Sequence, residues 1–136
     1  MISLVMDTSN SYLAVGLYQD NVCLEAFQEK GSRRQSEKAI PTLKEVLDRH
    51  DIALKDVDEM IITSGPGSYT GVRVAMTIAK TLAAVSDVKI KSVSSLAAYA
   101  GMNQALSVID ARGHKVFVGV YENGLPLIKE QVMTLE

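Results

Sequence analysis

Residues 60–85, MIITSGPGSYTGVRVAMTIAKTLAAV, contain a strand, a loop and a helix in immediate succession. Met60 to Thr63 is an apolar run of strand length, which is typical of a strand buried on both faces. Gly65 to Gly71 supplies turn residues, and apolar residues then recur with helical spacing from Thr70 to Val85. A buried strand followed directly by a long helix predicts an α/β protein.

The flanking segments extend this unit into a mixed sheet with helices. Three strands joined by short turns, the first of them Ile2 to Met6, predict an antiparallel meander at the start of the chain. Asn123-Gly124 predicts a hairpin near its end. We expect no internal repeat. The other predicted elements are strands over 2–6, 13–17, 22–28, 89–93, 105–109 and 115–121 and helices over 40–47 and 95–101.

Composition limits the classes of function. The chain has 136 residues, which suits one core, and a formal net charge of −2. This charge argues against an autonomous nucleic-acid binder, which needs surplus Lys and Arg. Cys23 is the only cysteine, so no internal disulfide forms and we expect a cytoplasmic protein. No apolar run approaches the roughly 20 residues that cross a bilayer, and we expect neither a signal peptide nor a membrane partner.

The glycine-rich loop is the strongest local signal for a binding site. Its glycines permit close backbone approach, and the helix that follows offers free N–H groups. The loop could cradle a phosphate, or it could be a tight structural turn. It lacks the Gly-Lys-Ser/Thr ending of a P-loop. The candidate nucleotide-binding residues in this loop are Gly65, Gly67, Ser68, Thr70, Gly71 and Arg73.

A second candidate site follows the first strand. Asp7 and Ser9 stand where a buried strand ends, and an acidic residue there can face a nucleotide phosphate or its metal. The competing interpretation is a turn with a side-chain cap. We therefore treat Asp7 and Ser9 as weak nucleotide-binding candidates.

The helix over 72–85 carries an unusually broad apolar arc. Surface helices usually show a narrower apolar stripe. Its small residues Ala75, Ala79 and Ala83 would let a second helix approach closely. Either the rest of the chain covers this arc or another subunit does.

The sequence shows no clear group of catalytic residues. The two histidines, His50 and His114, have no metal-ligand spacing with another His or Cys, and we expect both at the surface. We identify no nucleophile with an adjacent base and no metal ligands.

Several motifs, taken in order, resemble the TsaB (YeaZ) family over nearly the whole chain. The glycine-rich segment is the most specific of them. The motifs are Ile2-Ser-Leu-Val-Met-Asp-Thr-Ser9, Gly65-Pro-Gly-Ser-Tyr-Thr-Gly-Val-Arg73, Ala79-Lys-Thr-Leu-Ala83, Ser92-Val-Ser-Ser-Leu96 and Ile109-Asp-Ala-Arg112.

The resemblance implies a fold and a pathway. It implies an actin-like ASKHA lobe with an RNase H-like mixed five-stranded sheet flanked by helices. It implies a role in forming threonylcarbamoyladenosine beside the tRNA anticodon, as partner of the catalytic paralogue TsaD and the ATPase TsaE. It implies that tRNA binds only through the complex. The alternative is an ATPase or phosphotransferase of the same fold that uses Asp7 and the glycine-rich loop; peptidase chemistry has no support.

The non-catalytic role rests on two positions. The catalytic paralogue carries two metal-binding histidines four residues apart, and Ser95 and Tyr99 stand at those positions here. Serine and tyrosine are weak ligands for such a metal. Gln35 stands where relatives often carry a histidine, which leaves that position without a role.

The resemblance also predicts the organisation and the contact surface. We expect a first lobe over residues 1–102 and the initial strands of a truncated or short second lobe over 103–136. The lobe should pair with itself as a homodimer when the paralogue is absent. No nucleotide should be bound tightly, although ATP or ADP could lie at the interface with the paralogue. The predicted interface residues are Ile40, Leu43, Leu47, Val74, Ala75, Ile78, Ala79 and Leu82.

These interface residues yield a specific expectation. A charge at Ile78 or Ala79 should abolish binding to the paralogue without unfolding the chain. If the chosen side chain faces its own sheet, the variant should unfold instead.

Overall fold

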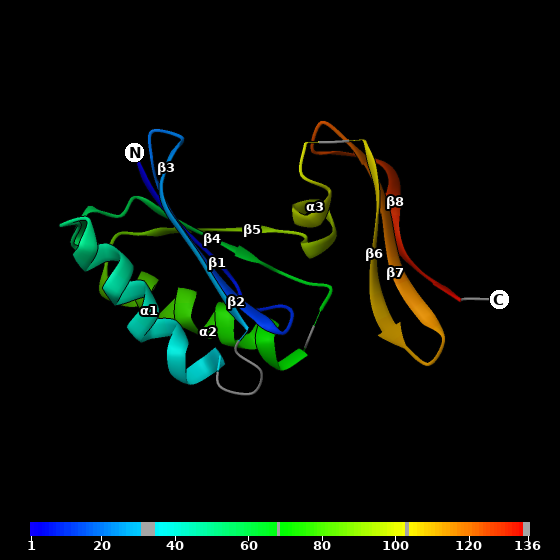
Figure 1. Cartoon of the computed structure of the whole chain (residues 1–136), viewed down its shortest axis with the longest axis horizontal. Coiled ribbons are helices and arrows are strands. Elements are labelled where there is room, and N and C mark those ends of the chain that lie inside the picture. The colour runs from blue at the N-terminus through cyan, green and yellow to red at the C-terminus, as the bar shows by residue number, and fades with distance from the viewer. Residues whose placement is uncertain (31–34, 68, 103, 135–136) are drawn as a thin grey trace.

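The computed structural model describes residues 1–30, 35–67, 69–102 and 104–134, so the predicted site residue Ser68 lies outside the described residues. Among the described helices, none is long and apolar enough to cross a membrane. The elements (Figure 1) are β1 (Ile2–Asp7), β2 (Tyr12–Gln19), β3 (Val22–Lys30), α1 (Gln35–Arg49), the 3-10 helix η2 (Leu54–Asp56), β4 (Glu59–Thr63), α2 (Tyr69–Val85), β5 (Lys89–Val93), α3 (Ser95–Ala100), β6 (Ala105–Arg112), β7 (Lys115–Glu122) and β8 (Leu125–Thr134).

The first sheet is mixed and five-stranded, in the order β3-β2-β1-β4-β5. β1, β2 and β3 form the predicted antiparallel meander, while β4 and β5 lie parallel to β1. Asp20 and Asn21 join β2 to β3 with φ values of 50° and 68°, as a two-residue hairpin turn requires. The parallel strands need long crossovers, which α1 and α2 provide. The predicted fold class is therefore confirmed.

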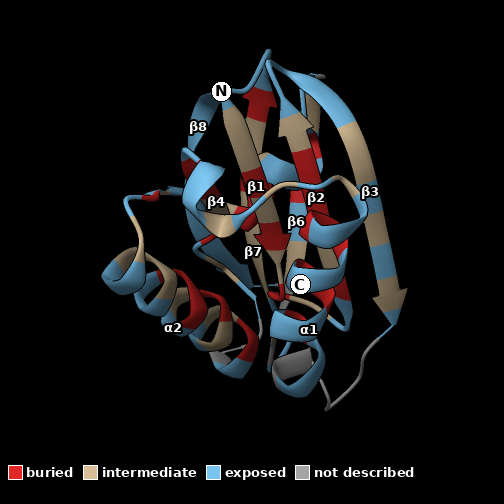
Figure 2. Cartoon of the chain, turned by 90° about the vertical axis from the view of Figure 1, so that its left-hand side faces the viewer, coloured by how far each residue is buried: buried red, intermediate tan, exposed pale blue. Residues whose placement is uncertain are grey.

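The core lies on one face of this sheet. α1 and α2 cover that face together (Figure 2), and their apolar stripes pack on alternate residues of the strands. The main members of the core are Leu4, Met6, Leu13, Val15, Leu17, Met60 and Ile62 from the strands and Ala39, Leu43, Val46, Leu47, Ala75, Ile78 and Ala79 from the helices.

This packing corrects most of the predicted interface. Because Leu43, Leu47, Ala75, Ile78 and Ala79 are buried against the chain's own sheet, the prediction that they contact another chain is wrong for this fold. Val74 and Leu82 are half-buried against the same core. Ile40 is the exception, since 52% of its surface is exposed. Intramolecular packing thus explains the buried part of the apolar arc of α2.

The second sheet contains β6, β7 and β8 in that order, all antiparallel. The predicted Asn123-Gly124 hairpin is confirmed, with φ values of 52° and 79°. α3 packs on this sheet through Leu96 and Ala100, which meet the buried ring of Tyr121. α3 therefore shares its core with the second sheet, and the domain boundary after residue 102 stays a prediction.

The two meanders share a four-residue motif. The middle strand of each three-stranded meander carries Val-Gly-X-Tyr, at residues 15–18 in β2 and 118–121 in β7. In each case the tyrosine ring occupies the space beside the glycine: an added Cβ would lie 2.9 Å from Cε2 of Tyr18 at Gly16, and 2.6 Å from Cε2 of Tyr121 at Gly119. A single four-residue motif is too short to count as an internal repeat.

Candidate functional site

The carboxylate of Asp7 joins the ends of two neighbouring parallel strands. Its Oδ1 accepts hydrogen bonds from the Ser9 backbone N (2.8 Å), Ser9 Oγ (2.6 Å) and Thr63 Oγ1 (2.6 Å). Asp7 ends β1 and Thr63 ends β4, so these contacts fix the carboxyl edge of the sheet. The geometry is that of a turn with a side-chain cap, in which Oδ1 is fully used by protein donors.

The glycine-rich loop packs directly on this turn. A Cβ added at Gly67 would lie 2.5 Å from the Ser9 carbonyl oxygen and 2.8 Å from Ser9 Cβ, so a side chain there has no room. The hydroxyl of Thr8, which is fully buried, donates to the carbonyl oxygen of Gly71 (2.5 Å). The structure therefore brings Asp7, Ser9, Gly67 and Gly71 together, and we call this contact the loop–turn junction.

The remaining predicted loop residues lie at the margins of the junction. The Gly65 carbonyl oxygen accepts a hydrogen bond from the Ser95 backbone N (2.8 Å), and Gly65 has a φ of +99°, which favours glycine. Thr70 and Arg73 are exposed in the first turn of α2. Sequence reasoning missed the roles of Thr8 and Thr63, because both act through partners distant in the chain.

α3 carries Ser95 and Tyr99, the two residues on which the prediction of a non-catalytic role rests. Ser95 is fully buried, and its Oγ has no hydrogen-bond partner among the described residues. Tyr99 points outward, where its hydroxyl accepts a hydrogen bond from Asn10 Nδ2 (2.5 Å). Within the described ranges, no group of three or more His, Cys, Asp or Glu side chains could hold a metal ion.

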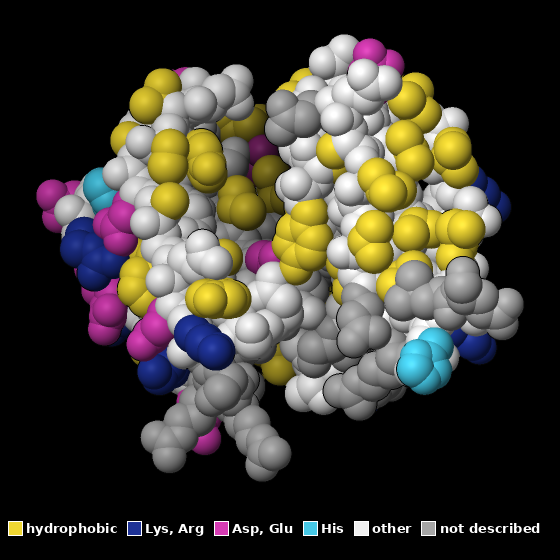
Figure 3. Space-filling view, turned by 45° about the vertical axis from the view of Figure 1, so that its right-hand side comes forward, with side chains coloured by type: hydrophobic (Ala, Val, Ile, Leu, Met, Phe, Trp, Pro, Cys, Tyr) yellow, Lys and Arg dark blue, Asp and Glu magenta, His cyan; other side chains and the backbone are white. Residues whose placement is uncertain are grey.

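A hollow lies on the sheet face that α1 and α2 leave uncovered. Its volume is about 340 Å³, and it is lined by β1, β2 and β3 residues that include Asp7, Tyr18 and Gln28. The molecule is visibly hollowed between its two sheets (Figure 3). Most of the lining is apolar, so the hollow offers few groups that would orient a polar ligand.

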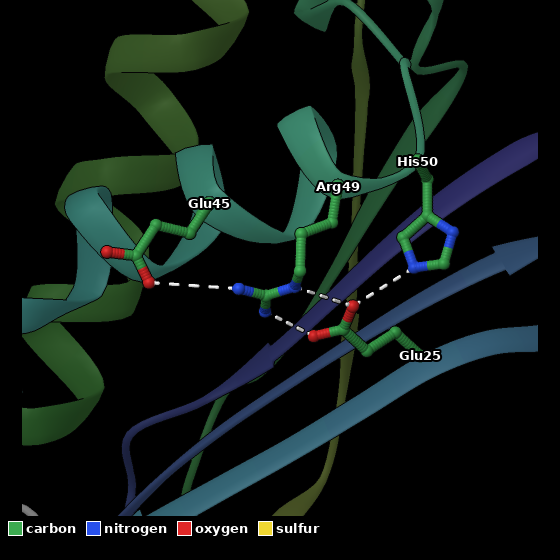
Figure 4. Close-up of polar contacts among 4 residues, drawn as sticks. All are labelled: Glu25, Glu45, Arg49 and His50. Atoms are coloured by element: carbon green, nitrogen blue, oxygen red, sulfur yellow. Dashed lines mark hydrogen bonds and ion pairs between the residues drawn. The ribbon is translucent and has the colours of Figure 1, made fainter.

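A separate ionic cluster joins β3 to the end of α1 (Figure 4). Arg49 donates from Nε to Glu25 Oε1 (3.0 Å) and from Nη2 to Glu25 Oε2, while His50 Nε2 lies 3.0 Å from Oε1. Arg49, and then His50, lower the pKa of Glu25 to about 2. His50 is only partly exposed, with 28% of its side chain accessible, whereas His114 is exposed as predicted.

Replacing Glu25 with glutamine should change how stability depends on pH. The pKa of Glu25 is lower in the folded chain than its ordinary value of 4.5, so its stabilising effect is complete above pH 4.5 and is lost as the pH falls toward about 2. We expect Glu25→Gln to unfold at lower urea concentration at neutral pH and to match the wild type near pH 2. Urea unfolding at pH 7, 4.5, 3 and 2 measures this.

Glu45→Gln is the matched control. Glu45 Oε2 lies 3.9 Å from Arg49 Nη1, and its side chain is 69% exposed, so its loss should have little effect at any pH. A difference between Glu25→Gln and wild type that stays constant from pH 7 to pH 2 would contradict the assignment.

The comparisons with known proteins agree with one another. The family model that matches, over residues 28–134, is described as TsaD, tRNA N6-adenosine threonylcarbamoyltransferase. The chain is 35% identical over 132 residues to the tRNA threonylcarbamoyladenosine biosynthesis protein TsaB of Bacillus subtilis, a match that covers 92% of this chain and 58% of that protein. It is 30% identical to TsaB of Escherichia coli, over 90% of this chain and 57% of that protein.

The similarity extends to a solved structure. YeaZ from Pseudomonas aeruginosa superposes with a TM-score of 0.88 at 29% identity, over 97% of this chain and 67% of that one. The chain spans less than three fifths of the length of the Bacillus subtilis and Escherichia coli TsaB proteins.

Proposed function

Because the chain belongs to the TsaD protein family and is similar to its TsaB (YeaZ) members over most of its length, we propose that it is a non-catalytic subunit in threonylcarbamoyladenosine formation in tRNA. The similarity to a named biosynthesis protein over 92% of the chain carries this proposal. The burial of Ser95 and the bond between Tyr99 and Asn10 support the non-catalytic part, because both side chains serve packing or local structure.

The proposed partners follow from the similarity to the TsaB (YeaZ) proteins. The chain binds the catalytic paralogue TsaD and, with it, the ATPase TsaE; alone, it forms a homodimer. It meets tRNA only through the complex, which agrees with a net charge of −2. The proposed location is the cytoplasm, in keeping with a single cysteine, Cys23.

The proposed contact surface is the outer side of α1 and α2. The two helices lie side by side on the sheet (Figure 2) and leave their outer faces bare. Ile40 is 52% exposed and Val85 71% exposed, while Val74 and Leu82 keep part of their surface accessible. Ile40, Val74 and Leu82 are the predicted interface residues that remain accessible, and Ile40 is the best anchor.

Ile40→Asp should therefore block assembly without unfolding the chain. An aspartate at the centre of an apolar contact loses the burial of Ile40 and places a charge opposite apolar atoms, which costs about 2 kcal/mol or more, roughly 30-fold in Kd. Pull-down and calorimetric titration with the catalytic paralogue measure the loss, and circular dichroism confirms the fold.

Ala98→Asp is the control for this test. Ala98 is exposed on α3, which lies between the two sheets and away from α1 (Figure 1), and the variant should bind as the wild type does. A folded Ile40→Asp protein with wild-type affinity would remove α1 from the interface.

The role of nucleotide is part of the same proposal. We propose that the isolated chain does not hold ATP or ADP tightly and that any nucleotide lies at the interface with the paralogue. The loop–turn junction supports this, since Asp7 Oδ1 is already shared among three donors. Tight ATP–magnesium binding by the chain alone, with turnover lost in Asp7→Ala, would contradict the non-catalytic role.

A further inference from the structure

The two sheets have separate apolar cores, and α3 lies between the sheets (Figure 1). Buried residues of the first sheet, α1 and α2 form one cluster, whereas Leu96, Ala100 and Tyr121 form the other. None of the buried residues that the structure describes belongs to both clusters. Because apolar packing joins α3 to β6 and β7, we call α3 and the second sheet together the α3 body.

Polar contacts reinforce the attachment of α3 to the second sheet. Ser94 Oγ caps α3 by accepting hydrogen bonds from the backbone N of Leu96 (3.2 Å) and of Ala97 (3.4 Å). The same hydroxyl donates to Glu130 Oε1 on β8, and so does the hydroxyl of Tyr121 on β7. One carboxylate oxygen thus ties the start of α3 to both strands, so we expect the α3 body to move as a unit.

Hydrogen bonds, in contrast, join the α3 body to the segments beside the loop–turn junction. The Ser95 backbone N donates to the Gly65 carbonyl oxygen (2.8 Å), and Asn10 Nδ2 donates to the Tyr99 hydroxyl (2.5 Å). Asn10 is itself oriented by its Oδ1, which accepts from the backbone N of Tyr12 (2.7 Å). Water can replace such hydrogen bonds at small net cost, whereas separating α3 from its own sheet would expose apolar surface. The contact with the junction is therefore the weaker of the two.

The chain passes from the first sheet to the α3 body at the link between Val93 and Ser94. Val93 ends β5, and its carbonyl oxygen accepts from the Ser64 backbone N (2.9 Å), which keeps Val93 on the first sheet. Ser94 is the N-cap of α3 and is bound to Glu130. Rotation at this link would move the α3 body and leave both cores intact.

We propose that the hydrogen bond between Tyr99 and Asn10 is a releasable latch. When it is closed, it holds the α3 body against the turn that follows β1. When it opens, the α3 body pivots at the link after Val93, and Ser95 separates from Gly65. Tyr99 is 48% exposed, so water or a polar group of another molecule can reach its hydroxyl and compete with Asn10. The latch is a property of this chain by itself and does not depend on the proposed function.

Tyr99→Phe removes the latch and keeps the aromatic ring. Amide hydrogen exchange should become about fivefold faster at Tyr12 and Ser95, because the loss of a hydrogen bond changes an opening equilibrium by a factor of this size. The Gly101 amide donates to the Ala97 carbonyl oxygen (3.0 Å) inside the α3 body and should keep its wild-type rate. Equally faster exchange at Gly101 would mean that α3 unfolds, and would contradict the pivot.

A distance measurement shows whether the α3 body moves. Cys23, the only cysteine, is exposed on β3 of the first sheet. Leu127 is 53% exposed on β8, so Leu127→Cys provides a second labelling site on the second sheet. Double electron–electron resonance between two spin labels should give one narrow distance distribution with the latch intact. Tyr99→Phe should broaden this distribution or add a second one.

Two further variants complete the test. Tyr12→Phe is the matched control, because it removes the hydroxyl of another exposed tyrosine and should leave the distances unchanged. Asn10→Ala opens the latch from its other side, and it serves alone if Tyr99→Phe fails to fold. In the Asn10→Ala background, Tyr99→Phe should add no further broadening. Unchanged distances in folded Tyr99→Phe, equal broadening in Tyr12→Phe, or additive broadening in the double variant would each overturn the proposal.

Discussion

Ala79→Asp is expected to abolish the cooperative unfolding transition of the chain. Ala79 is fully buried on α2, where it packs between the helix and the sheet. A carboxylate in this position loses its hydration without gaining a partner, which costs several kcal/mol. A domain of this size has about 5–15 kcal/mol of stability in total, so most of it would be lost. Thermal melting followed by circular dichroism shows the outcome.

The control for Ala79→Asp lies on the other side of the same helix. Thr77 is exposed, and Thr77→Asp should change the stability little, because threonine and aspartate have similar helix propensities. A folded Ala79→Asp protein that fails to bind the catalytic paralogue would restore the original interface and contradict the packing of α2. Recovery of structure on acidification would fit burial, because protonation removes the charge.

The order of helices and strands along the chain was accessible from the sequence because it depends on local patterns. The apolar run of β1, the turn residues after β2 and the glycine-rich loop before α2 each specify one element. The apolar arc of α2 was recognised as well. Periodicity shows that a helix face is apolar, but it does not show whether the chain or a partner covers it. The interface prediction was wrong for the residues of α1 and α2 that the chain's own sheet covers.

The candidate site likewise contains residues that local motifs identified and contacts that they did not. Asp7 and Gly67 were found because each stands in a recognisable local motif. Their contact through Ser9 required the folded structure, and so did the bond of Thr8 to Gly71, which lies 63 positions away. Glu25 and Arg49 were missed for a similar reason, since they lie 24 positions apart on a strand and a helix.

Gly67→Ala is expected to destabilise the loop–turn junction by about 3 kcal/mol, the upper end of the usual cost of overpacking. The new Cβ would lie 2.5 Å from the Ser9 carbonyl oxygen, and the obstacle is backbone, so neither a rotamer change nor a flexible side chain can relieve it. The loop must move away from Ser9. The midpoint of thermal unfolding should fall by roughly 6–15 °C.

Gly113→Ala separates this clash from a general effect of replacing glycine. Gly113 has a φ of +60°, and an added Cβ there meets no atom within 4 Å, so only backbone strain of about 1 kcal/mol is expected. Hydrogen exchange gives a second readout, because the Ser9 amide donates to Asp7 Oδ1 at 2.8 Å. That amide should exchange faster in Gly67→Ala and stay protected in Gly113→Ala. Equal protection and equal melting temperatures in the two variants would mean that the loop does not depend on the close contact between Gly67 and Ser9.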